Sequence, residues 1–213
     1  GYTFSVDVTP PGGITSTLDD VDATDNNSTP TIAFENVEEG AQVTVYSDAA
    51  CTLSLGSETS SDETGEISIQ TSALAEGILY TFYYLAIDEL GGPDNTTSCT
   101  TTGLTYTFDA TPPSTPSSIA LVDPVTSPGN DNTPTVTVGG VTSGDTIHLF
   151  ANSACVDEAN LLESVTANDT TVGIAVPESL RDDGSYAFYA QAEDPAGNKS
   201  VCSGVLETYV LDT

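Results

Sequence analysis

Apolar and small or polar residues alternate over short stretches along the whole chain. Ile32 and Phe34 are separated by one small residue, and Val136 and Val138 by one polar residue. This spacing of two places successive apolar side chains on the same face of a β-strand. Turn-forming residues separate the stretches, and no long window repeats apolar residues at helical spacing. The pattern therefore predicts an all-β chain built from short strands.

The pattern occurs twice. Residues 28–51 match residues 132–155 without a gap, so that Cys51 aligns with Cys155. The stretch from Tyr80 matches the one from Tyr186 in the same order. The length of 213 residues fits two domains of about 100 residues each. We expect tandem domains at 12–109 and 110–213, with residues 1–11 as a leading strand and linker from a preceding module.

Each copy repeats the same inward-facing positions and the same candidate tyrosine corner. Leu74 lies six residues before Tyr80, and Leu180 lies six before Tyr186. That spacing lets the phenol bond backbone near the preceding loop of a sandwich. The positions expected to face the core are Ile32, Phe34, Val43, Val45, Tyr80, Phe82, Tyr84 and Ala86, and Val136, Val138, Ile147, Leu149, Tyr186, Phe188, Ala190 and Ala192. The predicted fold is two immunoglobulin-like β-sandwiches.

A short Asp/Thr/Pro-Pro linker joins the copies. It runs from Asp109 to Pro113, and the same order occurs from Asp7 to Pro11. Two consecutive prolines fix φ and remove two donors, which ends a strand and stiffens the junction. Copy two ends at Thr213, where another Pro-Pro pair would be expected. We therefore expect a longer array of modules.

The net charge of the chain argues against partners that are themselves negatively charged. The chain has 32 Asp and Glu residues against two Lys and Arg, a formal net charge of -30. Such a chain is repelled by phosphate backbones and anionic lipids, so we expect no nucleic-acid partner. The apolar runs are only a few residues long, so we expect no membrane insertion. Bound divalent cations or a salty medium would relieve the self-repulsion, and both explanations stay open.

The four cysteines fall two per copy at nearly the same spacing. This spacing indicates bridges between Cys51 and Cys99 and between Cys155 and Cys202. No CxxC pair or nearby His completes a zinc site. Structural disulfides imply an extracellular or periplasmic setting.

Candidate catalytic residues are few. His148 aligns with Thr44 and falls on the outward alternation of its strand, so we expect an exposed strand residue. No G-x-S-x-G motif occurs, and no carboxylate pair stands out for glycoside hydrolysis. We predict that the chain is not an enzyme.

Several motifs of copy two resemble one family. The order of a Thr-Pro-Thr strand, a Gly-Asp turn, the Asp183–Tyr186 segment, the Ala192–Asn198 segment (AEDPAGN) and a closing TYVLDT is similar to the bacterial Ig-like (Big) repeats of giant adhesins. Copy one departs from this pattern between Ile87 and Gly92, where only the Asp and the first Gly are kept.

The resemblance implies Ca2+ at the junctions between modules, where carboxylates would supply the six to eight oxygens that the ion needs. In a sandwich, we expect Asp194 to lie at the end of domain 2 where Asp109 enters. The alternative is that these residues cap turns by local hydrogen bonds. The candidate metal-binding residues are Asp7, Asp19, Asp25, Asp88, Asp109, Asp123, Asp131, Asp194 and Asp212.

The resemblance implies a structural extender of a long adhesin or fibre at the bacterial cell surface, or secreted. Its partners would be neighbouring Ig-like modules of the same chain, and the terminal ligand stays open. One alternative is a subunit of a self-assembling filament, whose segment Tyr2–Val8 adds a strand to a neighbouring subunit. Another is a module that binds carbohydrate or a protein partner through its loops.

Overall fold

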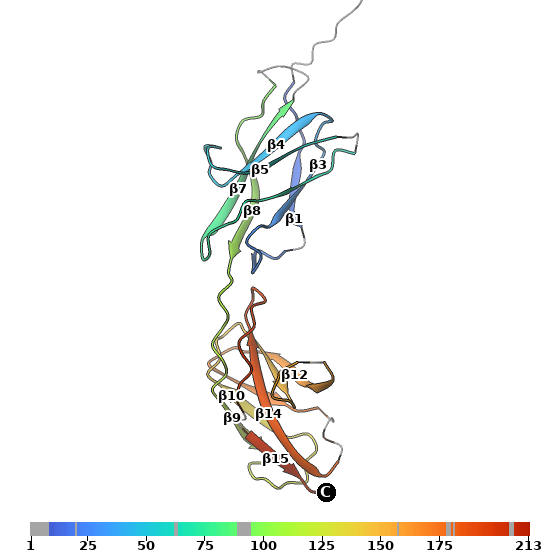
Figure 1. The fold of residues 1–213 in the computed structure, drawn as a ribbon, viewed down its shortest axis with the longest axis vertical. Coiled ribbons are helices and arrows are strands. Elements are labelled where there is room, and N and C mark those ends of the chain that lie inside the picture. Colours follow the sequence, from blue (N-terminus) through green and yellow to red (C-terminus); the bar gives the residue numbers. More distant parts are fainter. Residues whose placement is uncertain are drawn as a thin grey trace, which may run out of the picture. The chain divides into compact units, whose positions relative to one another are not determined.

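The computed structural model describes residues 9–19, 21–61, 64–88, 95–156, 158–177, 180, 182–204 and 207–213. The chain divides into two compact units, Gly1–Ala110 and Thr111–Thr213 (Figure 1). The described residues are all-β, as predicted, apart from one 3-10 turn, η1 (Glu158–Asn160). No helix in these ranges is long and apolar enough to cross a membrane.

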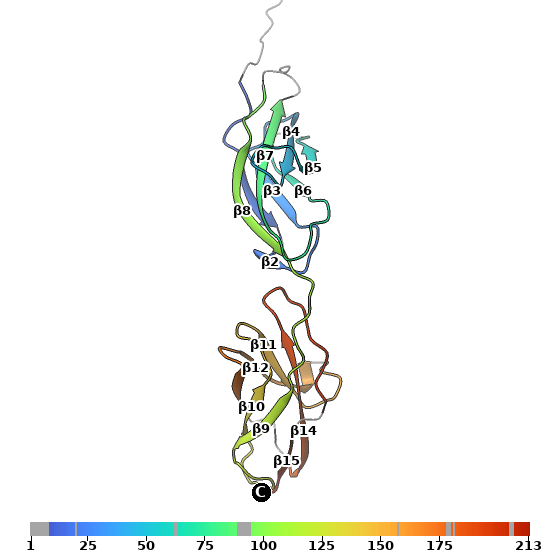
Figure 2. The same cartoon turned by 90° about the vertical axis from the view of Figure 1, so that its left-hand side faces the viewer.

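Unit 1 contains two sheets. The smaller sheet has the order β1-β3-β6, and the larger has the order β2-β8-β7-β4-β5. Neighbours are antiparallel except β2 and β8, which run parallel along the edge seen in Figure 2. The strands are β1 (Thr15–Asp19), β2 (Thr24–Asp25), β3 (Thr31–Glu35), β4 (Ala41–Tyr46), β5 (Ser54–Thr59), β6 (Ile67–Gln70), β7 (Leu79–Asp88) and β8 (Thr100–Phe108).

Unit 2 repeats this order. Its sheets are β13-β10-β9 and β12-β11-β14-β15, so each strand occupies the place of its counterpart in unit 1. A parallel bridge between Gly129 and Leu211 stands where unit 1 has the short strand β2. The strands are β9 (Ser118–Asp123), β10 (Thr135–Gly139), β11 (Thr146–Phe150), β12 (Leu161–Thr166), β13 (Thr171–Ala175), β14 (Gly184–Glu193) and β15 (Glu207–Leu211).

Both sheets of a unit contribute to one core. In unit 1, the Phe34 ring from β3 meets the Tyr84 ring from β7 edge to face, with centroids 5.7 Å apart. The predicted inward positions are buried in both units, except that Tyr80 and Tyr186 are partly buried and pack against the core. Two sheets that share one core are compatible with a β-sandwich.

The tyrosine corners are confirmed. The Tyr80 hydroxyl accepts a hydrogen bond from the Ala75 N–H at 3.0 Å, and the Tyr186 hydroxyl donates to the Asp182 carbonyl at 2.7 Å. Leu74 and Leu180 are buried beneath these loops. Each corner therefore holds the loop before the long strand β7 or β14 against its own unit.

A second tyrosine clip occurs on the last strand of each unit. Tyr106 on β8 and Tyr209 on β15 are fully buried. The Tyr106 hydroxyl donates to the Asn27 carbonyl, and the Tyr209 hydroxyl donates to the Asp131 carbonyl. Both clips fasten the loop that leads into the Thr-Pro-Thr strand.

Candidate functional site

Each unit is closed by its own disulfide. Cys51 is joined to Cys99 and Cys155 to Cys202, with S–S distances of 2.05 and 2.07 Å. These are the pairs that the repeated spacing predicts. Cys51 and Cys155 also share a left-handed backbone, with φ values of 49° and 48°, so the two turns have the same shape. Disulfides of this kind indicate an oxidising, non-cytoplasmic compartment.

The candidate Ca2+ residues of the loops make local hydrogen bonds. Asp194 Oδ1 accepts from the N–H groups of Ala196 and Asn198, both at 2.9 Å. Asp25 and Asp131 each accept from the N–H two residues ahead, at 2.8 Å. These are Asx turns, the local capping that the sequence leaves open as the alternative to Ca2+ binding.

The candidates divide between the two ends of each unit. In unit 1, the Asp109 N–H donates to the Asp25 carbonyl at 3.0 Å, so these residues lie at one end, and buried Asp88 lies at the opposite end of β7. In unit 2, Asp131 and Asp212 lie at one end, and Asp194 follows the opposite end of β14. The arrangement within each unit thus follows the expected alternation of strand direction.

The remaining candidate Ca2+-binding residues are Asp19, Asp123 and Asp7. Asp19 ends β1, and Asp123 ends β9 and precedes a cis proline. Asp7 and the proposed donor strand Tyr2–Val8 lie outside the described residues. Within the ranges that the structure describes, no group of three or more His, Cys, Asp and Glu side chains could hold a metal ion. The Ca2+ site stays a prediction.

Sequence reasoning missed Asp145, which directly precedes β11. Only 4% of this residue is exposed, and Oδ2 has no hydrogen-bond partner. Burial raises the pKa of the Asp145 carboxyl, and the nearby charge of Asp194 adds to that rise. Ala41 occupies the aligned position in copy one, so unit 2 has a buried acid that the repeat does not require.

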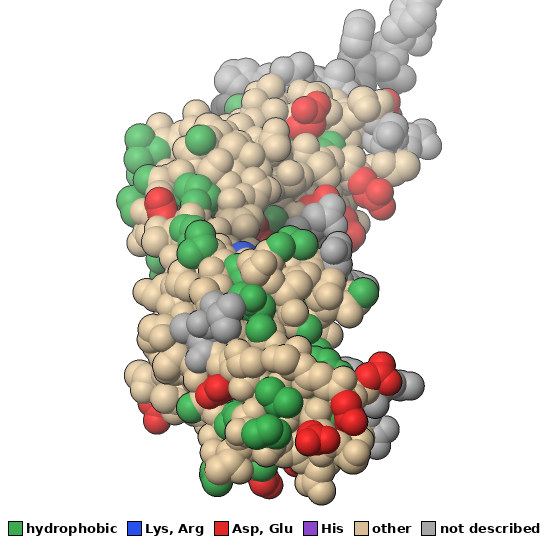
Figure 3. All heavy atoms as spheres, turned by 60° about the horizontal axis from the view of Figure 1, so that its bottom comes forward, with side chains coloured by type: hydrophobic (Ala, Val, Ile, Leu, Met, Phe, Trp, Pro, Cys, Tyr) green, Lys and Arg blue, Asp and Glu red, His purple; other side chains and the backbone are tan. Residues whose placement is uncertain are grey.

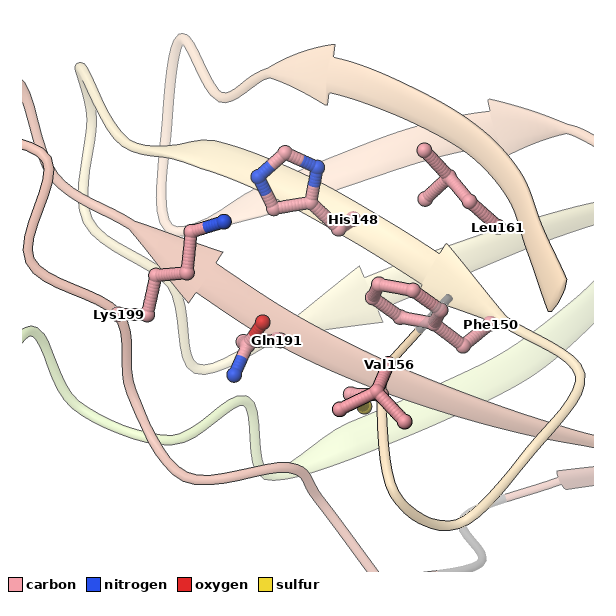
Figure 4. Close-up of a pocket in the computed structure, with 7 residues that line it drawn as sticks. His148, Phe150, Val156, Leu161, Gln191 and Lys199 are labelled. Carbon is pink, nitrogen blue, oxygen red and sulfur yellow. The ribbon is translucent and has the colours of Figure 1, made fainter. Parts of the chain in front are cut away.

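A pocket of about 470 Å3 lies on the outer face of the sheet β12-β11-β14-β15. Figure 4 shows His148, Gln191 and Lys199 toward one side, and Phe150, Val156 and Leu161 toward the other. The strand register explains this grouping, because His148 is opposite Gln191 and Phe150 is opposite Leu161. Cys155 also lines the pocket.

The polar half of the pocket is held by a chain of hydrogen bonds. His148 Nε2 lies 2.9 Å from Glu193 Oε2, and His148 Nδ1 lies 2.8 Å from the Ser164 hydroxyl. Because a carboxylate oxygen only accepts, Nε2 carries the hydrogen of the first contact. Lys199 Nζ lies 3.2 Å from the same Glu193 oxygen. The prediction that His148 is simply exposed is wrong, because only 16% of its side chain is accessible.

Ser164, His148 and Glu193 are the residue types of a hydrolytic triad, but their arrangement differs from one. In a serine protease, the nucleophile bonds Nε2 and the carboxylate bonds Nδ1. Here the two ring nitrogens are exchanged. The Ser164 N–H, a natural oxyanion donor, bonds Glu163 Oε1 at 3.0 Å instead. The prediction that the chain is not an enzyme stays a prediction.

Copy one keeps the serine, Ser57, but has different residues at the other places. Thr44 is opposite Leu85 and Ser57, where unit 2 has His148 opposite Gln191 and Ser164. The bridge between Ile87 and Thr96 corresponds to the bridge between Glu193 and Lys199. The polar chain of the pocket is therefore specific to unit 2.

Acidic side chains outnumber basic ones on the face of the molecule seen in Figure 3. Figure 3 shows red Asp and Glu side chains at separate positions on the visible face and almost no blue. Lys199 is the only Lys or Arg in the part of the chain that the structure describes, because Arg181 lies outside it. The pocket is thus lined by the only Lys or Arg side chain in the described ranges.

No family model and no curated protein match the chain. Among solved structures, it is similar to the human OSCAR ligand-binding domain at 10% identity, with 95% of this chain and 100% of that chain covered and a TM-score of 0.37. It is similar to a biofilm associated protein BSP domain at 19% identity, covering 93% of this chain and 29% of that one, with a TM-score of 0.29.

A third similarity is to dimeric latent PorU from Porphyromonas gingivalis, at 16% identity and a TM-score of 0.31, covering 96% of this chain and 20% of that one. The chain therefore spans less than a third of the length of two of these three proteins. At such low TM-scores, none of the three assigns a function to this chain.

Proposed function

We propose that this chain is a pair of tandem immunoglobulin-like domains, 12–109 and 110–213, from a long extracellular bacterial adhesin or fibre. The domains act as an extender that holds another part of the protein away from the cell. In such a protein, length and resistance to unfolding carry the function, and no single side chain does.

The strand order supports an immunoglobulin-like fold. In that fold, the first, second and fifth strands share a sheet, and the third, sixth and seventh strands form the other. Both units follow this plan, except that the fourth strand, β5 or β12, pairs with β4 or β11 in the second sheet, where the seven-strand form of the fold has it in the first. The parallel contact of β2 with β8 fits a first strand that switches sheets.

The repeated disulfide is the observation that carries the proposal. In each unit it joins the turn after β4 or β11 to the segment that follows β7 or β14. A bridge at this position locks 48 or 47 residues of the chain into a closed loop. Force applied along the chain then cannot fully extend a unit, which suits an extender.

The proposal includes Ca2+ ions that are bound by the aspartates at the ends of the units. A formal net charge of -30 supports it, because divalent cations would offset the repulsion among carboxylates. The resemblance to Big repeats supplies the residues, Asp109 and Asp194 first among them.

Sedimentation velocity on the full chain separates the extender from the filament alternative. An extender stays monomeric from about 10 to 500 µM at moderate salt, since its neighbours are joined covalently. A subunit that donates Tyr2–Val8 to another chain would form species that grow with concentration, and deletion of residues 1–8 would abolish them. Growth of that kind would contradict the extender.

A further inference from the structure

The pocket on the outer face of unit 2 has the composition of a small-ligand site. Its volume of about 470 Å3 falls in the range of about 300–1,000 Å3 that is usual for such sites. Phe150, Val156 and Leu161 form an apolar wall, and 52% of Val156 is exposed at the surface. His148, Gln191 and Lys199 stand opposite. A ligand that fits needs an apolar group and a polar group at its two ends.

The charges of the pocket favour a carboxylate as the polar group. The Lys199 ammonium has three N–H groups, and its ion pair with Glu193 Oε2 at 3.2 Å uses one of them. The Glu193 charge is shared between Lys199 and the His148 N–H. The negative charge of Glu193 is therefore offset by its neighbours, and it repels a ligand carboxylate that approaches Lys199 less than an unpaired carboxylate would.

A cationic ligand would gain little selectivity from this pocket. The chain has 32 carboxylates, so a cation finds counter-charges over the whole surface. An anion finds Lys199 as the single Lys or Arg among the described residues. The net charge opposes the approach of a small monovalent anion less than that of a polyanion or an anionic lipid surface, since salt at about 0.15 M screens charges beyond about 8 Å.

The comparison of the two units shows that the fold does not require these residues. Unit 1 builds the same sheet with Thr44, Leu85, Ile87 and Thr96 at the aligned places, and the strand order is unchanged. The polar chain in unit 2 is thus an addition to the shared scaffold. Unit 1 also supplies a control surface within the same molecule.

We propose that unit 2 binds small amphiphilic carboxylates in this pocket. An aromatic or branched aliphatic group lies against Phe150, Val156 and Leu161, and the carboxylate accepts hydrogen bonds from Lys199. This site goes beyond the extender function, and neither depends on the other.

The test is a titration of the 15N-labelled full chain followed by amide chemical shifts. The probe is 3-phenylpropionate, and the matched probes are 3-phenylpropanol and 3-phenylpropylamine. We expect 3-phenylpropionate to move the resonances of residues 156, 161, 191 and 199 saturably below about 10 mM, and to leave those of Thr44 and Leu85 in place. The alcohol and the amine should bind at least about five-fold more weakly, the effect of losing one typical hydrogen bond.

Two variants change the affinity in opposite directions. Lys199→Met removes the ammonium from a side chain that is 55% exposed, so the fold is kept, and it should weaken binding about five- to ten-fold. Glu193→Gln removes the competing carboxylate and should strengthen binding about two- to five-fold. Thr96→Met, at the place in unit 1 that corresponds to Lys199, should change nothing.

Any of three results would overturn the proposal. One is that the alcohol or the amine binds as tightly as the carboxylate. Another is that the shifts appear equally on the two units. The third is that 3-phenylpropionate causes no saturable shift below about 10 mM, while the spectrum shows a folded chain.

Discussion

Asp145 is a carboxylate that the fold buries beside another acid, Asp194. Its folded-state pKa is raised, so the protonated form is favoured by folding. The corresponding stability is complete below pH of about 4 and is lost as pH rises through the folded-state pKa. At pH 7, the ionised side chain therefore destabilises unit 2.

Asp145→Asn should raise the melting temperature of unit 2 at pH 7 by roughly 4 °C, the shift that about 1 kcal/mol produces in a domain of this size. The gain should shrink at pH 3, where the wild-type carboxyl is protonated. Exposed Asp169→Asn removes the same charge from the surface and serves as control. Scanning calorimetry that finds equal gains for the two variants at pH 7 would show that net charge, rather than burial, sets the effect.

Tyr106 predicts how unit 1 responds to alkali. Burial, with a contribution from the charge of Asp25, raises the pKa of Tyr106 to about 12. The folded state holds its proton more tightly than the unfolded state, so stability is full below pH of about 10 and is lost between pH 10 and 12. The loss amounts to about 2–3 kcal/mol.

Tyr106→Phe should remove this loss and cost about 1 kcal/mol at pH 7, because the bond to the Asn27 carbonyl is gone. Urea unfolding at pH 8 and pH 11, followed by amide resonances of each unit, measures both effects. The counterpart Tyr209→Phe should weaken unit 2 at pH 8 and leave unit 1 unchanged. An unaltered pH dependence of unit 1 in Tyr106→Phe would mean that Tyr106 does not cause the loss of stability in alkali.

At the scale of residues, alternation predicts which side of a strand a residue faces, but not what it meets there. His148 is on the outward face, as its alternation indicates. Its burial depends on Ser164 and Glu193, which come from β12 and the far end of β14. Asp145 was missed for the same reason, because its neighbour Asp194 is distant in the sequence and no local pattern joins them.

The contribution of each disulfide to the free energy of unfolding can be measured directly. Closing a loop of this length stabilises a unit by about 4 kcal/mol through the unfolded state. The double variant Cys51→Ala/Cys99→Ala should lower the unfolding free energy of unit 1 by about that amount and leave unit 2 unchanged. Cys155→Ala/Cys202→Ala is the matched control with the opposite result.

Urea denaturation of the full chain, followed by NMR resonances that report each unit, makes this measurement. A loss below about 1 kcal/mol in both double variants would mean that the bridges contribute little to the fold. Equal losses in both units from either variant would show that the units unfold together.

At the scale of elements, the strands that alternate clearly could be predicted. Ile32 and Phe34 on β3 and Val43 and Val45 on β4 are buried as expected. The short strand β2 could not be predicted, because two residues give no period. β5 and β12 were also difficult, since their side chains are mostly half-buried or exposed and lack a clean alternation. Their place at the sheet edge explains this.

At the scale of the molecule, Ca2+ is the untested expectation. If the aspartates at the ends of the units bind the ion, 5 mM CaCl2 should raise the melting temperature of the full chain, since a ligand of the native state stabilises by mass action. EDTA should reverse the gain, and Asp109→Ala should reduce it. Equal melting temperatures in CaCl2 and EDTA at moderate salt would mean that the acidity is an adaptation to the medium.

If the chain is an extender, its two disulfide-closed units should unfold independently under force. Force spectroscopy on a single full-length chain, held at both of its ends, measures this. Two independent units should give two separate unfolding events under oxidising conditions. A reductant should lengthen each of the two events by about 170 Å, the extended length of the 48 or 47 residues released. A single joint event, or lengths that do not change with reduction, would contradict the extender.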